Sequence, residues 1–357
     1  MTRFLNSVTA LVFFFILLSG SVYFLLATPP AEIPEERRVA NPPPTFDYQS
    51  LESGEFLKAS EAYLLDAMPY RRNFFSLHTK IFADVLKNPN CHGIREGAWG
   101  LEKSPPAYED DLLLGNLDTI EHYLSRFFEG KRAYAALIPH KGYYTGDKTG
   151  YDRAFCAMAA REGLRAIEIA DTLTPSDYFY GDIHIRPECY GTFAEKLGAT
   201  IGFVPTQNLH PSQKFSSRGT LALQFPRERY DTFLTLYDPE GVIASCEVTS
   251  TDGSRQSIYR EDLIAGDPYD LYLGGEAGNG ILSVKNPMAT TKRRLIVLRD
   301  SFARAFLPYL VGDYAEIVLV DLRTPYPILS KSELLFADDA TDILLLVSTH
   351  TLFSTKF

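Results

Sequence analysis

The chain has 357 residues, 45% of them hydrophobic, and a formal net charge of −10. This length suffices for one large domain or two moderate ones, and the apolar content supports a real core. The acidic balance, with lysine and arginine nowhere clustered beyond short pairs and one triplet, argues against a nucleic-acid partner, because neutralising phosphates requires such clusters.

The first part of the chain is a long uncharged stretch. Residues 4–28 carry no charged side chain and are mostly apolar, which is long enough to cross a bilayer. A cleaved signal peptide is the alternative, but its apolar region would be shorter, and Pro29 and Pro30 follow here instead of a small-residue cleavage site. We predict a single-pass signal-anchor helix within residues 1–28. The flanking charges favour a cytoplasmic N-terminus, which places the main domain outside, on the cell membrane.

Residues 29–50 are rich in proline and charge and are typical of an extended linker. We predict that residues 51–357 form one α/β domain. Its first part, residues 51–88, has helical periodicity interrupted at Pro69. A segment rich in turns, or a short hairpin, is expected over residues 93–108, and a helix over residues 111–128.

From residue 133 onward, apolar strands alternate with helices. Strands are predicted at residues 133–139, 165–170, 295–298, 316–322 and 342–348, and helices at 151–162 and 188–197. This alternation predicts a mostly parallel sheet flanked by helices. Residues 203–290 instead show alternating apolar and polar positions, for example in Thr220–Phe225 and Thr232–Tyr237, and predict a β-rich insertion.

Ser301 follows the strand at residues 295–298 and precedes apolar residues with helical spacing. A serine at such a junction lies beside backbone N–H groups that a helix leaves unpaired, where several serine hydrolases place their nucleophile. An ordinary helix N-cap is the alternative. Of the seven histidines, His184 has the best context for a base, because residues i and i+2 of an extended segment face the same side and Asp182 could orient its ring.

The four cysteines, Cys91, Cys156, Cys189 and Cys246, suit an oxidising compartment. They allow three disulfide pairings, among which the sequence does not choose, and four free thiols are the alternative. No Cys-x-x-Cys pair occurs, and Cys91-His92 alone is a weak zinc signal. We therefore predict no metal site and no cofactor.

Several segments together resemble the bacterial DHHW protein family over about residues 90–357. They occur in the family's order and comprise Leu137–Tyr144, Tyr180–Tyr190, Arg299–Phe302, Asp321–Arg323 and Leu346–Thr349. The family is related to the alginate O-acetyltransferase accessory proteins, whose fold is similar to that of SGNH hydrolases. The resemblance implies a catalytic triad with Ser301 as nucleophile, His184 as base and Asp182 as orienting acid.

The resemblance also implies secondary site residues and reveals departures from the family pattern. Lys141, Gly275, Asn279 and Arg323 are the candidates for binding substrate or for the oxyanion hole. The family's histidine and tryptophan within the Asp-x-His motif are replaced here by isoleucines, Ile183 and Ile185, and its asparagine after Gly-Gly by Glu276. An ionised glutamate cannot donate a hydrogen bond to an oxyanion, so these departures weaken the case for activity more than the case for the fold.

The resemblance implies a membrane-anchored, extracytoplasmic serine acyltransferase or esterase. It would add acetyl groups to a cell-surface polysaccharide, or remove them, through an acyl-serine intermediate. The relatives imply a multi-span membrane O-acyltransferase as partner. The alternative is a scaffold or glycan-binding accessory subunit of such a system with impaired catalysis, a reading that the substitutions at residues 183, 185 and 276 favour.

Overall fold

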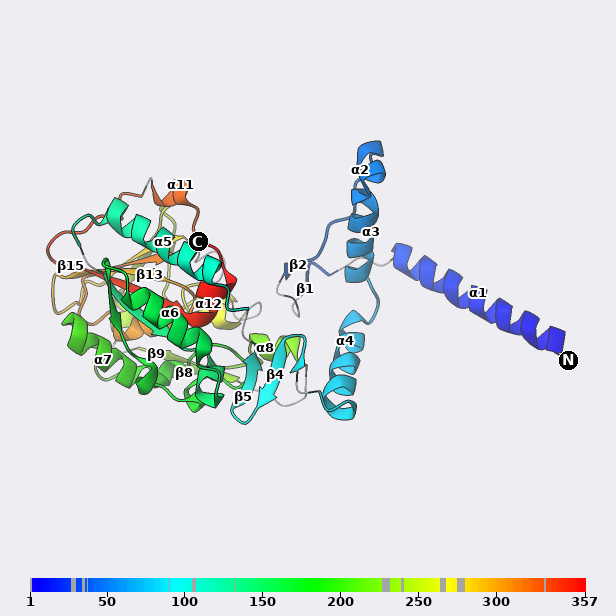
Figure 1. Cartoon of the computed structure of the whole chain (residues 1–357), viewed down its shortest axis with the longest axis horizontal. Helices are drawn as coiled ribbons and strands as arrows, with labels where there is room; N and C mark the ends of the chain where they lie inside the picture. The colour runs from blue at the N-terminus through cyan, green and yellow to red at the C-terminus, as the bar shows by residue number, and fades with distance from the viewer. Residues whose placement is uncertain are drawn as a thin grey trace. The chain divides into compact units, whose positions relative to one another are not determined.

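The computed structural model describes the whole chain apart from residues 1, 27–29, 34–35, 37, 89, 105–106, 132, 227–231, 239–240, 264–267, 275–279 and 331. It contains two compact units, which can be followed by colour in Figure 1. The first comprises residues 1–92 and 223–228, and the second comprises residues 93–222 and 229–357. The predicted domain boundary at residue 50 differs from this division, because helical periodicity alone does not say which core a helix joins.

Helices dominate the first unit. Its elements are α1 (Thr2–Leu26), β1 (Glu32–Ile33), β2 (Arg38–Val39), α2 (Tyr48–Ser53), α3 (Glu55–Asp66), α4 (Arg71–Lys80), the π-helix η1 (Ile81–Val85) and β3 (Asn90–Cys91). The predicted interruption at Pro69 separates α3 from α4. Tyr70, which precedes α4, has a φ of 56°, so the chain turns there through a left-handed residue and cannot continue one helix.

The segment predicted as a signal-anchor does form one helix, α1. Measured over the described part of the chain, no helix combines the length and the apolar character that crossing a bilayer requires.

The second unit is built on an eight-stranded sheet with the order β11-β10-β12-β14-β13-β15-β6-β7. The strands are β6 (Ala133–Ile138), β7 (Leu164–Ile167), β10 (Glu247–Ser250), β11 (Arg255–Gln256), β12 (Ile281–Lys285), β13 (Arg294–Arg299), β14 (Glu316–Asp321) and β15 (Thr341–Ser348). From β14 to β7 every neighbouring pair is parallel. Parallel neighbours need crossover connections, and helical segments supply them, as the sequence predicts.

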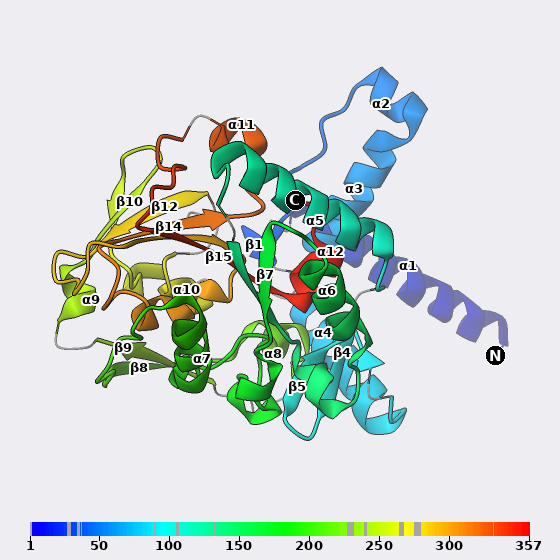
Figure 2. The same ribbon diagram turned by 60° about the vertical axis from the view of Figure 1, so that its left-hand side comes forward.

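Helices cover both faces of this sheet (Figure 2). They are α5 (Asp110–Phe127), α6 (Thr149–Ala159) and α12 (Thr349–Ser354) on one face, and α7 (Gly191–Ile201) and α10 (Ala303–Phe306) on the other. Alternate residues of β13 enter the two cores: Leu295 and Val297 pack with α7 and α10, whereas Ile296 and Leu298 pack with α5 and α6. Successive side chains therefore enter opposite cores, which explains why the sequence of a strand buried on both faces is a continuous apolar run.

The predicted β-rich insertion does not form one separate body. Strands β10, β11 and β12 extend the central sheet as antiparallel strands, while β8 (Pro211–Ser217) and β9 (Thr232–Tyr237) pair with each other. The prediction of a strand at Thr220–Phe225 is wrong, because the structure has a short helix, α8 (Thr220–Gln224). The amides of Leu221 and Ala222 both donate to the carbonyl of Gly181, a contact across the fold that outweighs a short local pattern.

The remaining elements of the second unit are short. They are the antiparallel hairpin β4 (Ile94–Gly97) and β5 (Gly100–Lys103), the helices α9 (Val242–Ser245) and α11 (Tyr326–Leu329), and the 3-10 turns η2 (Lys141–Thr145), η3 (Ala170–Thr172), η4 (Pro175–Asp177), η5 (Pro187–Cys189), η6 (Glu261–Leu263), η7 (Pro268–Leu271) and η9 (Leu307–Tyr309). The hairpin lies in the segment predicted to hold one. All four cysteines are free thiols.

Candidate active site

Ser301 lies in the turn that follows β13, at the carboxyl edge of the central sheet. Because β14 and β15 run parallel to β13, the ends of all three strands meet at this edge, where α/β proteins bind ligands. The helix after the turn, α10, begins at Ala303, and Phe302 occupies its N-cap position. Ser301 is therefore not the cap of this helix.

Asp300 fixes the turn that carries Ser301. Its side chain is 3% exposed. One carboxylate oxygen accepts from the Phe302 amide at 3.0 Å, and the other accepts from the Ser348 amide and the Thr351 hydroxyl, both at 2.8 Å. These bonds join the end of β13 to the end of β15. Asp300 therefore has a structural role, with two backbone amides and one hydroxyl as its partners.

Ser301, His184 and Asp182 form a continuous hydrogen-bonded chain. The His184 Nε2 atom lies 2.9 Å from the Ser301 Oγ atom. On the other side of the ring, Nδ1 lies 2.6 Å from the Asp182 Oδ1 atom. Both Asp182 and His184 are 3% exposed. An imidazole that faces a carboxylate on Nδ1 presents Nε2 to a hydroxyl as a proton acceptor.

The Asp182 carboxylate has further hydrogen bonds that keep it charged. Its Oδ2 accepts from the Thr220 amide at 2.7 Å, and its Oδ1 also accepts from the His184 amide at 3.1 Å. Burial opposes the charge, but interaction with His184 and these two amides hold the pKa of Asp182 well below its ordinary value. An ionised Asp182 can both orient the His184 ring and stabilise its protonated form.

Two aromatic rings enclose His184. Tyr269 stacks on the imidazole at a centroid distance of 3.7 Å and an interplanar angle of 9°, and Phe302 lies 4.8 Å away. Tyr269 is 3% exposed, and its hydroxyl contacts the Ser301 carbonyl at 3.4 Å. These contacts restrict ring rotation, so the His184 imidazole is held in the orientation that faces Ser301.

Lys141 does not point into solvent. Its ammonium donates to the carbonyls of Leu101 and Phe179 at 2.9 and 2.8 Å, and burial lowers its pKa to about 8. Lys141 lines a pocket together with Ile183 and Phe302. Because its nitrogen is already bonded to two carbonyls, we assign it to holding the loops around this pocket rather than to contacting substrate.

The other residues predicted to bind substrate or to form the oxyanion hole are Arg323, Gly275 and Asn279. The Arg323 guanidinium binds Asp321, with Nε and Nη2 at 2.8 and 2.7 Å from its carboxylate oxygens, so it is engaged in a bidentate ion pair at the end of β14. Gly275, Asn279 and Glu276 lie outside the described residues. The predicted contribution of Gly275 and Asn279 to an oxyanion hole stays a prediction.

Ile183 and Ile185, the isoleucines on either side of His184, lie in different surroundings. Ile185 is fully buried in the core that contains α7. Ile183 is partly buried and lines the pocket next to Phe302. The substitution at residue 185 is therefore absorbed by apolar packing, whereas that at residue 183 makes one wall of the pocket apolar.

Sequence reasoning missed Thr220 and Tyr269 as partners of the site, and it missed the bond between Ser348 and Asp300. Thr220 lies 38 positions from Asp182 and Ser348 lies 48 positions from Asp300, so no local periodicity could join them. Only Gly219, directly before Thr220, was a local signal. Its φ is +75°, and a Cβ atom there would lie 2.4 Å from the Gly181 carbonyl oxygen and 3.1 Å from the Asp182 Cβ atom.

Replacing Gly219 with alanine is expected to displace the loop that holds Asp182. The new methyl group meets backbone that cannot move independently, and the positive φ adds strain. We expect a loss of about 2–4 kcal/mol in the free energy of unfolding, measured by urea denaturation. Gly202→Ala is the matched control, because Gly202 has a φ of +89° but no atom within 4 Å of its added Cβ. Equal losses in both variants would refute the close-contact explanation.

Lys141→Met is expected to change how stability depends on pH. The folded pKa of Lys141, about 8, lies below its ordinary value of 10.5, so its buried charge disfavours folding below pH 8. This penalty disappears as the pH rises from about 8 to 10.5. The quantity to measure is the unfolding free energy of wild type minus that of Lys141→Met. We expect this difference to rise by up to about 3 kcal/mol between pH 7 and pH 10. A difference between wild type and Lys141→Met that does not change with pH would contradict the prediction.

Comparison with solved structures relates this fold to others at low sequence identity. The DHHW family protein from Eubacterium siraeum DSM 15702 matches with a TM-score of 0.57 and 16% identity, over 74% of this chain and 94% of that one. Bacillus cereus PatB1 with a sulfonyl adduct matches with 0.52 and 17%, over 74% and 98%. The O-acetyltransferase domain of Pseudomonas putida AlgJ matches with 0.48 and 14%, over 74% and 94%. Neither a family model nor a curated protein matches the sequence.

The matches to the DHHW family protein and to PatB1 define the class of fold. The chain is an α/β protein with a mostly parallel central sheet, like that of the DHHW family protein. The structural resemblance to that protein confirms the resemblance predicted from the sequence segments. Similar folds carry different activities, so the function depends on the chemistry of the site.

Proposed function

We propose that this protein is a serine acyltransferase or esterase that passes an acetyl group through an ester on Ser301. The observation that carries the proposal is the hydrogen-bonded chain in which His184 Nε2 lies 2.9 Å from Ser301 Oγ and Nδ1 lies 2.6 Å from Asp182. A serine hydroxyl is a weak nucleophile until an adjacent base removes its proton, and that base needs an orienting group.

In the first half-reaction, Ser301 Oγ attacks the carbonyl carbon of an acyl donor. His184 Nε2 takes the hydroxyl proton, and the Asp182 carboxylate stabilises the resulting imidazolium. The bond between the acyl carbon and the leaving oxygen then breaks, and His184 returns the proton to that oxygen. The products are an acyl-Ser301 ester and a free hydroxyl on the donor.

In the second half-reaction, an acceptor hydroxyl attacks the ester carbonyl while His184 removes its proton. Collapse of the tetrahedral intermediate breaks the bond to Ser301 Oγ, which takes the proton back from His184. A sugar hydroxyl as acceptor makes the protein a transferase, and water makes it an esterase. The same residues serve both outcomes, so access of water to the site decides between them.

The Ser301 amide is the proposed oxyanion donor. No acceptor among the described residues takes this N–H, and it belongs to the residue whose oxygen bonds to the acyl carbon. A backbone N–H in this position stabilises the negative charge that develops on the carbonyl oxygen. Gly275 and Asn279 are the proposed further donors.

We propose a polysaccharide of the cell surface as the acyl acceptor and a multi-span membrane O-acyltransferase as partner. This proposal comes from the resemblance of the sequence segments to the DHHW family and its relatives, and the fold shared with the DHHW family protein agrees with it. Location at the membrane is part of the same proposal. The apolar side chains of α1 are exposed, including Leu11 at 70% and Phe15 at 73%, and a bilayer would cover them.

The test is to incubate the purified whole chain with an acetylated chromogenic ester and with acetylated and unacetylated oligosaccharides. Release of acetate or its transfer to a sugar hydroxyl, with an acetylated Ser301 peptide detected by mass spectrometry, supports the proposal. Glycan binding without turnover, unchanged in Ser301→Ala, would instead identify a non-catalytic accessory subunit.

A further inference from the structure

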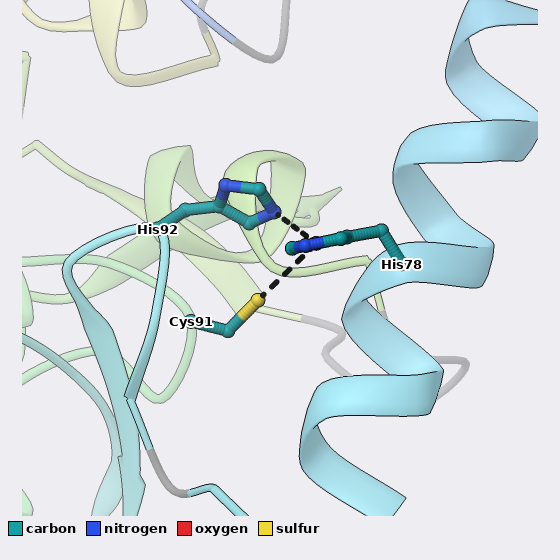
Figure 3. Close-up of side chains that lie close together, drawn as sticks. All are labelled: His78, Cys91 and His92. Atoms are coloured by element: carbon teal, nitrogen blue, oxygen red, sulfur yellow. Dashed lines mark hydrogen bonds between the residues drawn. The ribbon is translucent and has the colours of Figure 1, made fainter. Parts of the chain in front are cut away.

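Three side chains with metal-binding atoms lie close together in the first unit. None of them belongs to the proposed site around Ser301. They are His78, Cys91 and His92, and Figure 3 shows them pointing toward one another. His78 lies in the last turn of α4, Cys91 ends β3, and His92 follows it directly. Among the described residues this is the one group of three or more histidine, cysteine or acidic side chains with such proximity.

The distances between the donor atoms fit one tetrahedral metal ion. His78 Nδ1 lies 3.2 Å from His92 Nε2 and 3.8 Å from Cys91 Sγ. With zinc–nitrogen bonds near 2.05 Å and a zinc–sulfur bond near 2.3 Å, a tetrahedral site requires separations of about 3.3 and 3.5 Å. All three donor atoms lie within 4.8 Å of one another, so shifts of about 1 Å complete the geometry.

The surroundings hold the donors in place. Phe75 stacks on the His92 ring at a centroid distance of 4.2 Å, and Phe82 lies 4.3 Å from the His78 ring. The Cys91 side chain is buried, whereas both histidines are exposed. His92 also has a φ of 56°, a conformation that non-glycine residues rarely adopt. Such strain persists where the surrounding contacts over-determine it.

The donor set selects the kind of ion. Two imidazole nitrogens and one thiolate suit zinc, whereas calcium and magnesium prefer oxygen ligands. We propose that His78, Cys91 and His92 bind one Zn²⁺ ion, with the fourth position taken by water or by an external ligand. Binding forms one zinc–sulfur and two zinc–nitrogen bonds and releases the thiol proton to solvent. The proposal is independent of the chemistry assigned to Ser301.

The proposed ion links α4 to β3 and closes the loop between residues 78 and 91. A ligand that binds only the folded chain stabilises it in proportion to the logarithm of its concentration over its dissociation constant. Zinc should therefore raise the melting temperature of the first unit, and this gain should disappear when any of the three donors is removed. His78 lies thirteen positions before Cys91 in the sequence. Because of this separation, Cys91-His92 was considered by itself and gave only a weak indication of a zinc site.

The experiment uses the whole chain, stripped of metal with a chelator and titrated with Zn²⁺ and with Co²⁺. We expect one ion per chain and, with cobalt, absorption bands from tetrahedral coordination and from sulfur-to-cobalt charge transfer. Cys91→Ala should abolish the charge-transfer band, and His78→Ala and His92→Ala should each weaken zinc binding at least 10-fold.

Cys156→Ala and His122→Ala are the matched controls, because Cys156 is an exposed free thiol and His122 lies outside the cluster. Both should bind zinc like wild type. The proposal is overturned if Cys91→Ala keeps the charge-transfer band, if the controls lose affinity as much as the donor variants, or if the chain binds zinc no better than a variant lacking all three donors. In that last case the two histidines simply hydrogen-bond to each other.

Discussion

Replacing Ser301 with alanine is expected to lower kcat/KM for acetyl-ester cleavage by a factor of about 10⁴ or more. In the proposed mechanism, the substitution removes the atom that forms the acyl-enzyme bond, and loss of one member of a coupled nucleophile and base removes most of their joint effect. The free energy of unfolding should change by no more than about 1 kcal/mol, because the lost hydroxyl is half-buried and makes one hydrogen bond to His184.

The measurement pairs initial rates on a chromogenic acetyl ester with urea unfolding of the same preparations. Ser330→Ala removes an exposed serine hydroxyl away from the site and should leave both quantities unchanged. Undiminished activity in a folded Ser301→Ala protein would show that the nucleophile lies elsewhere. Asp182→Asn should also retain the fold but lose activity, because a neutral amide stabilises the imidazolium less.

Asp300→Ala is expected to reduce the free energy of unfolding by about 3–5 kcal/mol. The substitution leaves the amides of Phe302 and Ser348 and the hydroxyl of Thr351 without their acceptor in a buried site. Unpaired buried donors cost about 1–3 kcal/mol each, although water entering the cavity recovers part of this. Activity should fall as well, because the turn that positions Ser301 Oγ against His184 loses its connection to β15.

Denaturant midpoints and slopes provide the measurement for this variant. Asp339→Ala removes a surface carboxylate that binds Lys131 at 2.9 Å and should change stability by less than about 1 kcal/mol. Asp300→Asn should fall between the two, because the amide keeps one acceptor oxygen but presents a donor to a donor. If Asp300→Ala matched Asp339→Ala, the hydrogen bonds between the strand ends would not contribute to holding the turn.

The Ser301→Ala and Asp300→Ala variants together distinguish a chemical role from a structural role at two neighbouring positions. In the proposed mechanism, Ser301 contributes one reactive oxygen, and Asp300 contributes the hydrogen bonds that position it. A loss of activity with intact stability at Ser301, together with a loss of both at Asp300, is the pattern that a preorganised nucleophile requires. Uniform loss of stability at both positions would favour a purely structural role for this turn.

Much of the architecture was predictable because its signals are local. The continuous apolar run of β13 predicts a strand, because both faces of that strand are buried. The apolar positions of α5 recur at helical spacing, because one face of the helix packs on the sheet. The Asp182-x-His184 motif was predictable for the same reason, since its two residues are close in sequence. The strand at Thr220 was wrongly predicted, because five or six residues carry too little pattern to outweigh a tertiary contact.

The sequence by itself determined the alternation of strands and helices, the position of Ser301 at a strand end and the pairing of Asp182 with His184. Tertiary structure alone decided that β10, β11 and β12 extend the central sheet, that Tyr269 stacks on His184, and that Asp300 binds β15 through Ser348. It also brought His78 to Cys91 and His92. The physical reason is separation along the chain: hydrophobic periodicity reports which face of an element is buried, whereas contacts between distant residues depend on how the elements pack.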